Sequence, residues 1–296
     1  MNEIYLDNSA TTFLDPRVAE AMQAFQRSQP GNASSLHSAG LREAVGVEKA
    51  RNIIAGAVGA SPDEVIFCSG GTEANNMALQ GLATHLPAGA HFIVSAVEHS
   101  SVLDQVPLLA ARGVRISIAP VTADGRIDLD QLAKLFTSET KLVSVMHVNN
   151  EIGTVQPIEE IAALCRERKA LFHSDAVQSF CKIPIHLQNS GIDLITISAH
   201  KIHGPVGIGA LVLRKGLDLS PLLRGGSHEK GIRPGTLNAA GAVGFGAAVE
   251  LFSQEETARI TRLRDSLLDA IQARFPQVIL NGSHRYRAPH NLHLTF

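Results

Sequence analysis

The sequence predicts an α/β protein built around one central, mostly parallel sheet. Short apolar runs of strand length alternate along the chain with longer stretches of helical character, and this alternation is typical of α/β architecture. Several of the strand-like runs are apolar at nearly every position, as expected for strands that are covered on both faces of a sheet. Seven such runs with intervening helices indicate a single seven-stranded sheet flanked by helices.

The predicted elements follow one another without a repeat, a low-complexity segment or an obvious linker. Pro16 fits the first turn of a helix, where its missing N–H costs little. Helices are expected at residues 16–28, 41–58, 72–83 and 158–169, and a long helical stretch at about 239–275. Strands are expected at residues 65–68, 92–96, 114–118, 142–147, 171–173, 194–197 and 209–213.

Composition bounds the class of protein. A chain of 296 residues with 45% hydrophobic content can build a large core. The 26 Lys and Arg residues against 28 Asp and Glu give a net charge of −2, which argues against a nucleic-acid-binding surface. No apolar stretch is long enough to cross a bilayer, and the N-terminus lacks a signal pattern. Three cysteines indicate a reducing compartment, so a cytoplasmic protein is expected.

One lysine is the most informative residue. The apolar run 192–197 predicts a buried strand, and it leads into Ser198, Ala199, His200 and Lys201. Sheets of this kind place ligands at the carboxyl ends of their strands. Lys201 is therefore expected to point into a site, although a lysine after a strand is more often a solvated loop residue.

A second strand end supplies an acid. The run 170–174 leads into Asp175 and, three residues later, Gln178. An amine and a carboxylate delivered by neighbouring strands suit pyridoxal phosphate, which needs a Schiff-base lysine and an acid that keeps its pyridine nitrogen protonated.

A third segment could bind the phosphate of that cofactor. Residues 64–68 read as a strand, and residues 69–76, Ser-Gly-Gly-Thr-Glu-Ala-Asn-Asn, as a glycine turn that opens a helix. Unpaired N–H groups and the helix dipole make such a turn an anion site. An ordinary helix cap at Ser69 or Thr72 explains the segment about equally well. Together, the three segments meet the phosphate, pyridine and aldehyde requirements of pyridoxal phosphate.

Along essentially its whole length the chain resembles the class V pyridoxal phosphate enzymes, and more narrowly the cysteine desulfurases that supply sulfur for iron–sulfur clusters. The runs His-Lys-Ile-His-Gly-Pro at 200–205 and Gly-Gly-Ser-His-Glu at 225–229 resemble the NifS/IscS-type branch more than the SufS or selenocysteine lyase branch. The matching segments are residues 5–12, 31–37, 69–76, 98–99, 146–153, 175–178, 198–205, 225–229 and 233–236.

The resemblance implies the fold of the type I pyridoxal phosphate-dependent transferases and gives roles to the residues around the cofactor ring. Lys201 would be the catalytic lysine that carries the cofactor, and Asp175 would pair with the pyridine nitrogen. His99 would stack on the ring and shuttle protons as a second catalytic residue, and Gln178 would hydrogen-bond the phenolic oxygen. Without the resemblance, His99 would read as a polar loop residue.

The resemblance also implies a phosphate site and a homodimer. The phosphate would be held by Gly71, Thr72, Ser198 and His200. Thr236 would reach the phosphate of the partner subunit. Asn150 would lie near a cofactor oxygen and the substrate carboxylate; its alternative is a turn asparagine.

The implied reaction removes sulfur from L-cysteine and leaves L-alanine, with a mobile-loop cysteine that carries the sulfur as a persulfide to an acceptor or scaffold protein. That cysteine and the arginine for the substrate carboxylate are expected beyond residue 296. Cys68, Cys165 and Cys181 lack the expected surroundings and read as buried or incidental thiols. Residues 1–250 would form the large cofactor-binding domain, and residues 251–296 the start of a small, truncated C-terminal domain.

Three functions stay open at this point. The first is a cysteine desulfurase. The second is another class V enzyme, such as an aminotransferase or a selenocysteine lyase, which needs no persulfide cysteine. The third is a non-catalytic protein that keeps the fold for dimerisation or as a scaffold. No metal site is expected, because His228 and Glu229 have no second histidine at helical spacing.

Overall fold

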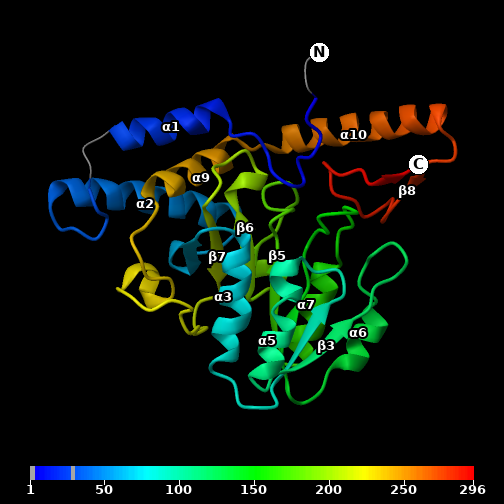
Figure 1. Cartoon of the computed structure of the whole chain (residues 1–296), viewed down its shortest axis with the longest axis horizontal. Helices are drawn as coiled ribbons and strands as arrows, with labels where there is room; N and C mark the ends of the chain where they lie inside the picture. Colours follow the sequence, from blue (N-terminus) through cyan, green and yellow to red (C-terminus); the bar gives the residue numbers. More distant parts are fainter. Residues whose placement is uncertain (1–3, 28–30) are drawn as a thin grey trace.

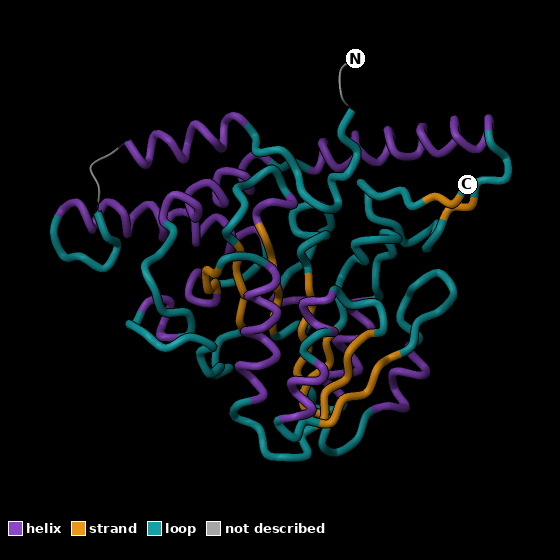
Figure 2. Tube along the Cα trace, viewed as in Figure 1, coloured by secondary structure: helices purple, strands orange, loops and turns teal. Residues whose placement is uncertain are grey.

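A seven-stranded sheet forms the centre of the molecule (Figures 1 and 2). The computed structural model describes residues 4–27 and 31–296. The strands lie in the order β1-β7-β6-β5-β4-β2-β3, and all are parallel except β7, which runs antiparallel to β1 and β6. The strands are β1 Val65–Cys68, β2 His91–Ser95, β3 Arg115–Ala119, β4 Thr140–Ser144, β5 Leu171–Asp175, β6 Leu194–Ser198 and β7 Gly209–Leu213. The predicted mostly parallel α/β sheet is confirmed.

The helices cover both faces of this sheet. In Figure 1, α3 and α5 lie in front of the strands, and α1 and α10 run along the top edge. The α-helices are α1 Pro16–Arg27, α2 Ser38–Ala57, α3 Gly71–Ala83, α4 Ser100–Leu103, α5 Val106–Ala111, α6 Leu129–Leu135, α7 Ile158–Glu167, α8 Leu187–Ser190, α9 Ala239–Leu251 and α10 Gln254–Arg274. Three short 3-10 helices are η1 Pro62–Glu64, η2 Ala199–Lys201 and η3 His228–Gly231.

All seven predicted strands exist, but some boundaries were wrong. The strand expected at 142–147 begins at Thr140 and ends at Ser144, because the chain then turns into the loop that carries site residues. The helical stretch expected at 239–275 is two helices, interrupted at Phe252, which has an extended conformation, with Ser253 capping the second. Residue 28, the expected end of the first helix, lies outside the described residues.

Alternation along the strands divides the core into two layers. Successive side chains of a strand point to opposite faces, so Phe67 packs with the layer under α2, α7 and α9, whereas Ile66 packs with the layer under α3, α4 and α5. Phe172 and Phe245 belong to the first layer and Phe92 to the second; all are fully buried. These layers hold the sheet rigid and fix the positions of the strand ends.

A buried ion pair ties the loop at η3 to the core. The guanidinium of Arg51 makes a two-pronged contact with Glu229, with Nη1–Oε2 and Nη2–Oε1 distances of 2.8 and 2.7 Å. Glu229 also accepts the backbone N–H of Phe67 at 2.6 Å. The Glu229 side chain is only 2% exposed, and Glu229 adopts a positive φ of 45°. Glu229, which the sequence places beside a histidine, is thus a structural residue.

We expect Glu229→Gln to destabilise the fold by about 3–5 kcal/mol, because it leaves the buried charge of Arg51 without its main counter-ion. Glu48 is a matched control: it pairs with Nε of the same arginine at 2.9 Å, but its side chain is 56% exposed. Glu48→Gln should cost less than about 1 kcal/mol. Urea unfolding of the two variants measures the difference, and equal losses would contradict this reading of Glu229.

Helix α10 packs weakly against the rest of the protein. Among the described residues, none of α10 is buried. The short strands β8 Ile279–Leu280 and β9 Leu294–Thr295 pair antiparallel beyond it. Segment 286–288 returns to the body of the protein, where Ala288 N–H donates to the Gly153 carbonyl at 2.8 Å. No helix in the described ranges has the length and apolar character to cross a membrane.

Candidate active site

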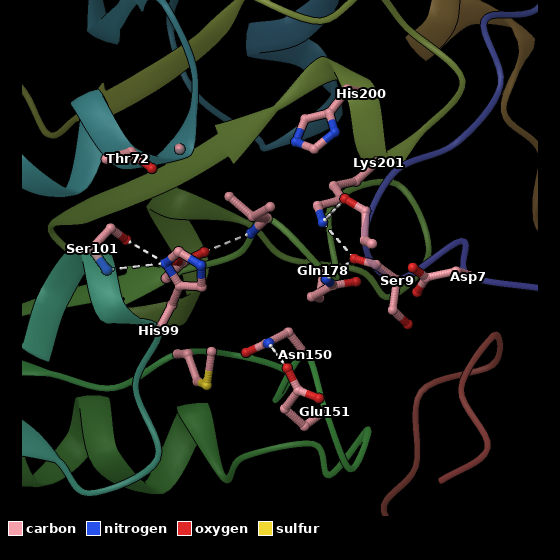
Figure 3. Close-up of a pocket in the computed structure, with 15 residues that line it drawn as sticks. Asp7, Ser9, Thr72, His99, Ser101, Asn150, Glu151, Gln178, His200 and Lys201 are labelled. Carbon is pink, nitrogen blue, oxygen red and sulfur yellow. Dashed lines mark hydrogen bonds between the residues drawn. The ribbon is translucent and has the colours of Figure 1, made fainter.

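A pocket of about 430 Å³ opens at the carboxyl ends of the parallel strands (Figure 3). Residues that follow β1, β2, β4, β5 and β6 line it, together with a segment near the N-terminus. Eight of the ten residues expected at the site line this pocket: Gly71, Thr72, His99, Asn150, Asp175, Gln178, His200 and Lys201. Ser198 and Thr236 do not.

Lys201 ends η2, directly after β6, and its side chain enters the pocket. The Nζ amine donates to the carbonyl oxygens of Ser9 and Ala10, the latter at 2.6 Å. Thr12 holds this N-terminal segment in place, since its Oγ1 donates to the carbonyl of His200 at 2.8 Å. Burial lowers the pKa of Lys201, although the nearby carboxylates of Asp175, Asp7 and Glu151 oppose that shift. A desolvated amine of this kind loses its proton more readily and can act as a nucleophile.

Asp175 is the last residue of β5, and β5 pairs in parallel with β6. Its Oδ1 accepts the backbone N–H of Val177 at 2.9 Å, and its Oδ2 accepts Nδ2 of Asn75 at 2.7 Å. Burial raises the pKa of Asp175, while these hydrogen bonds and the charges of His99 and Lys201 lower it. The carboxylate is thus oriented for a cationic partner in the pocket.

The other end of the pocket is built for an anion. α3 begins at Gly71 without a side-chain cap, so its first N–H groups lack that partner. Gly70 has φ 155° and ψ −174°, a conformation that essentially requires glycine. At Gly71, a Cβ would lie 2.8 Å from Cγ2 of Val177. Ser198 lies behind this turn, buried, and its Oγ finds no hydrogen-bond partner in the described part of the chain.

His200 contacts the same N-terminal segment. Its Nδ1 lies 3.1 Å from Oγ1 of Thr11, and burial together with the charges of Lys201 and Lys182 lowers its pKa to about 4. His200 is therefore neutral at neutral pH and would meet a phosphate as a hydrogen-bond donor rather than as a cation.

Three further expected residues have partners within the pocket wall. His99 accepts the backbone N–H of Ser101 at its Nδ1, 3.1 Å away. Asn150 donates to the neighbouring carboxylate of Glu151 at 2.8 Å. Gln178 donates to the carbonyl of Ser9 at 2.8 Å, and its Oε1 lies 3.1 Å from Nε2 of His290.

Thr236 is exposed and lies in the loop before α9, outside the pocket. The loop is nevertheless fixed beside the glycine turn, because Arg233 forms an ion pair with Glu73 in the first turn of α3, with an Nε–Oε1 distance of 2.9 Å. The expected role of Thr236 toward a partner subunit remains a proposal.

Sequence reasoning missed the residues that support the site from behind. Asn75 and Ser101 connect Asp175 to His99, and His290 reaches Gln178 from the far end of the chain. Asn75 could have been suspected, because it follows the glycine turn by one helical turn. Nothing in the sequence pattern marks Ser101 or His290.

The residues present fit pyridoxal phosphate. The buried hydroxyl of Ser198, which has no partner among the described residues, and the uncapped helix start can supply donors for a phosphate, and the oriented carboxylate of Asp175 suits a protonated pyridine nitrogen. Lys201 supplies the amine. The fold and the pocket therefore define the class of the chain as a pyridoxal phosphate-dependent protein.

Comparison with known proteins narrows the class. Residues 4–292 match the family model described as Aminotransferase class-V. Cysteine desulfurase IscS of Dictyoglomus turgidum is 45% identical over 298 residues, which are 99% of this chain and 76% of that protein. A solved NifS-like protein superposes with a TM-score of 0.92 at 36% identity, over 97% of this chain and 80% of that one. A structure of SspA in complex with cysteine gives 0.91 at 36% identity, over 99% and 84%.

The chain belongs to the class V aminotransferase family, and within it to the cysteine desulfurases. The resemblance drawn from its motifs is confirmed, as is pyridoxal phosphate as the cofactor of this family.

A second buried lysine lies near the pocket. Lys182 is 8% exposed, and its Nζ donates to the carbonyl of Gln178 at 3.3 Å. Burial, reinforced by the charge of Lys201, lowers its pKa from 10.5 to about 7. Between pH 7 and 10 the Lys182 amine is protonated in the unfolded chain but not in the folded protein. The stability of the fold therefore rises as the pH increases across this range, and Lys182 weakens the fold at lower pH.

Replacing Lys182 by methionine should remove that dependence. Relative to Lys182→Met, the free energy of unfolding of the unaltered protein is expected to rise by about 1 kcal/mol or more per pH unit between pH 7 and 9. Urea unfolding at the two pH values measures it, and Lys49→Met, an exposed change on α2, serves as the control. Parallel pH curves for the unaltered protein and Lys182→Met would show that Lys182 is charged in the folded state at neutral pH.

Proposed function

We propose that this chain is the cofactor-binding part of a cysteine desulfurase that takes sulfur from L-cysteine, leaves L-alanine and passes the sulfur on as an enzyme persulfide. The observation that carries the proposal is the meeting of Lys201, Asp175 and the start of α3 in one pocket. Cysteine as the substrate is supported by the relatives named cysteine desulfurase and by a structural neighbour solved with cysteine.

The residues expected at the site would then have the following tasks. Bound pyridoxal phosphate supplies an electron sink at the substrate α-carbon. The N–H groups of Gly71 and Thr72, with Ser198 and His200, would bind the phosphate. Asp175 would keep the pyridine nitrogen protonated.

The remaining residues act on the substrate side. Lys201 would hold the cofactor through its amine, and the same amine, when free, would take the proton from the substrate α-carbon as a base. His99 would cover the ring face, Gln178 would hydrogen-bond the phenolic oxygen, and Asn150 would lie near a cofactor oxygen and the substrate carboxylate. These assignments come from the resemblance to the cysteine desulfurases, and the positions of the side chains around the pocket support them.

The three cysteines of this chain are poor candidates for the thiol that accepts the sulfur. Burial raises the pKa of Cys68, Cys165 and Cys181 to about 12, so each stays protonated at neutral pH, whereas the thiolate is the reactive form. We therefore assign the persulfide to a cysteine outside residues 1–296, on the same polypeptide or on a partner. Slow alkylation of these three thiols would agree with that assignment.

The proposal includes a homodimer, in which Thr236 contributes to the partner's phosphate site, and an acceptor or scaffold protein for sulfur. The exposed position of Thr236 beside the glycine turn supports the first. We further propose that residues 1–250 form the cofactor-binding domain and residues 251–296 the start of a second, small one, since α10 contributes nothing to the core. A cytoplasmic location agrees with the three free thiols.

The test is the visible absorption spectrum of purified, dialysed protein before and after L-cysteine, followed by assays for alanine and for sulfide with a reducing thiol. A cofactor band that shifts with L-cysteine but not with D-cysteine is expected. Transamination of an amino acid with a keto acid, without sulfide, would favour another class V enzyme. A folded protein that binds no pyridoxal phosphate would leave only a scaffold role.

A further inference from the structure

A chain of hydrogen bonds links Asp175 and His99, two residues that are expected to contact the cofactor ring. Asn75, on α3, donates from Nδ2 to Oδ2 of Asp175 at 2.7 Å and also to Oγ of Ser101 at 2.8 Å. Oγ of Ser101 in turn lies 2.8 Å from Nδ1 of His99. Asn75 is fully buried and Ser101 is 8% exposed, so the two bonds of Asn75 lie away from water, whereas His99 is exposed at the pocket.

The donors and acceptors in this chain have only one consistent arrangement. The backbone N–H of Ser101 can only donate, and it points at Nδ1 of His99 at 3.1 Å, so Nδ1 carries no proton. Both hydrogens of the Asn75 amide are committed, one to a carboxylate and one to Ser101. The hydroxyl of Ser101 therefore accepts from Asn75 and donates its own proton to His99.

It follows that a neutral His99 ring carries its proton on Nε2. Within the described residues Nε2 makes no hydrogen bond, while the ring itself lines the pocket, as Figure 3 shows. Which nitrogen of a histidine is protonated is set by the bond that the other nitrogen makes. Here the protein makes two such bonds, both from Ser101.

We propose that Ser101 and Asn75 are positioning residues: they hold His99 as the Nε2-protonated tautomer, with that N–H turned to the pocket, and couple its orientation to the carboxylate of Asp175. His99 then meets the bound cofactor and substrate as a donor. In the neutral ring, Nε2 could accept a proton only if the ring proton first moved to Nδ1. A protonated Nδ1 could no longer accept the two hydrogen bonds from Ser101. The tautomer follows from the hydrogen bonds alone, whereas its use in turnover rests on the proposed function.

The experiment is 15N NMR of the whole chain labelled at histidine, without and with pyridoxal phosphate, with His99→Gln to assign the signals. We expect Nδ1 of His99 to be unprotonated and Nε2 protonated in both forms. Ser101→Ala should give a detectable share of the Nδ1-protonated form, because one of the two bonds that fix the ring is lost. Ser101→Thr, which keeps the hydroxyl, should restore the unaltered spectrum.

Ser100→Ala is the matched control, because Ser100 is the adjacent serine, exposed, and the described residues show no hydrogen bond to its hydroxyl. With L-cysteine, Ser101→Ala is expected to lower kcat about tenfold with little change in KM, since the group it affects acts in the reaction rather than in binding. Asn75→Ala should lower kcat similarly, and the double variant should lose no more than either alone, as for members of one network.

A proton on Nδ1 in the unaltered protein would overturn the proposal, and so would a Ser101→Ala spectrum identical to that of Ser100→Ala. The NMR result needs no substrate. It therefore stays decisive if the protein proves not to be a desulfurase, and a failure of the desulfurase assay alone would leave it standing.

Discussion

Lys201→Ala is expected to remove the cofactor's visible band and to lower turnover with L-cysteine by more than about 10³-fold, because the variant loses both the covalent anchor and the base at the substrate α-carbon. Pyridoxal phosphate should still bind, more weakly, through the start of α3 and Asp175. Absorption spectra after dialysis and the alanine assay measure the two effects.

The matched control is Lys182→Met, which removes the other buried amine near the pocket. This variant should keep the band and most of the activity. If Lys201→Ala kept the band and Lys182→Met lost it, the two lysines would exchange roles, and the reading of the strand end at β6 would be wrong.

Asp175→Asn should lower turnover by about 10²–10³-fold while leaving cofactor attachment to Lys201 intact. The amide cannot supply the negative charge that holds the pyridine nitrogen protonated, and fixed charges of this kind in a buried site contribute that order of rate enhancement. Spectral titration with pyridoxal phosphate and the alanine assay separate binding from turnover. Asp130→Asn, an exposed change in the first turn of α6, is the control.

Loss of stability will not explain that result. Burial raises the pKa of Asp175 above its ordinary value of 3.8, so the folded protein holds this proton more tightly than the unfolded chain and the group costs stability as the pH rises above about 4. Removing the charge relieves that cost, but the amide offers only one acceptor oxygen to Val177 and Asn75, so the free energy of unfolding at pH 7 should fall by no more than about 1–3 kcal/mol. A variant that is largely unfolded without urea at pH 7 would contradict this expectation.

The sheet could be predicted because its strands are short, apolar and buried on both faces. Val65–Cys68 and Gly209–Leu213 have the expected bounds. The strand after residue 140 was placed too late and too long, because Val145 and Met146 are as apolar as the strand itself although they already belong to the loop. Hydrophobic patterns locate burial, and they do not say where a ladder of hydrogen bonds ends.

The site residues could be predicted where a reactive side chain lies at the end of a predicted strand. Lys201 and Asp175 could be chosen from their own segments, whereas His99 needed the resemblance. Asn75 and Ser101 were not predicted because their roles depend on hydrogen bonds between residues far apart in the sequence. Asn75 and Ser101 are 26 residues apart, and Asn75 and Asp175 are 100 residues apart. Such contacts arise only when the sheet brings α3, α4 and β5 together, so no local pattern reports them.

We expect Lys201 to be the residue that carries the cofactor. The most direct measurement is to load the protein with pyridoxal phosphate, reduce the lysine–cofactor bond with borohydride, digest the protein and find the modified peptide by mass spectrometry. We expect the label on Lys201, with none on Lys182. A label on Lys182, or on exposed lysines without preference for Lys201, would contradict it.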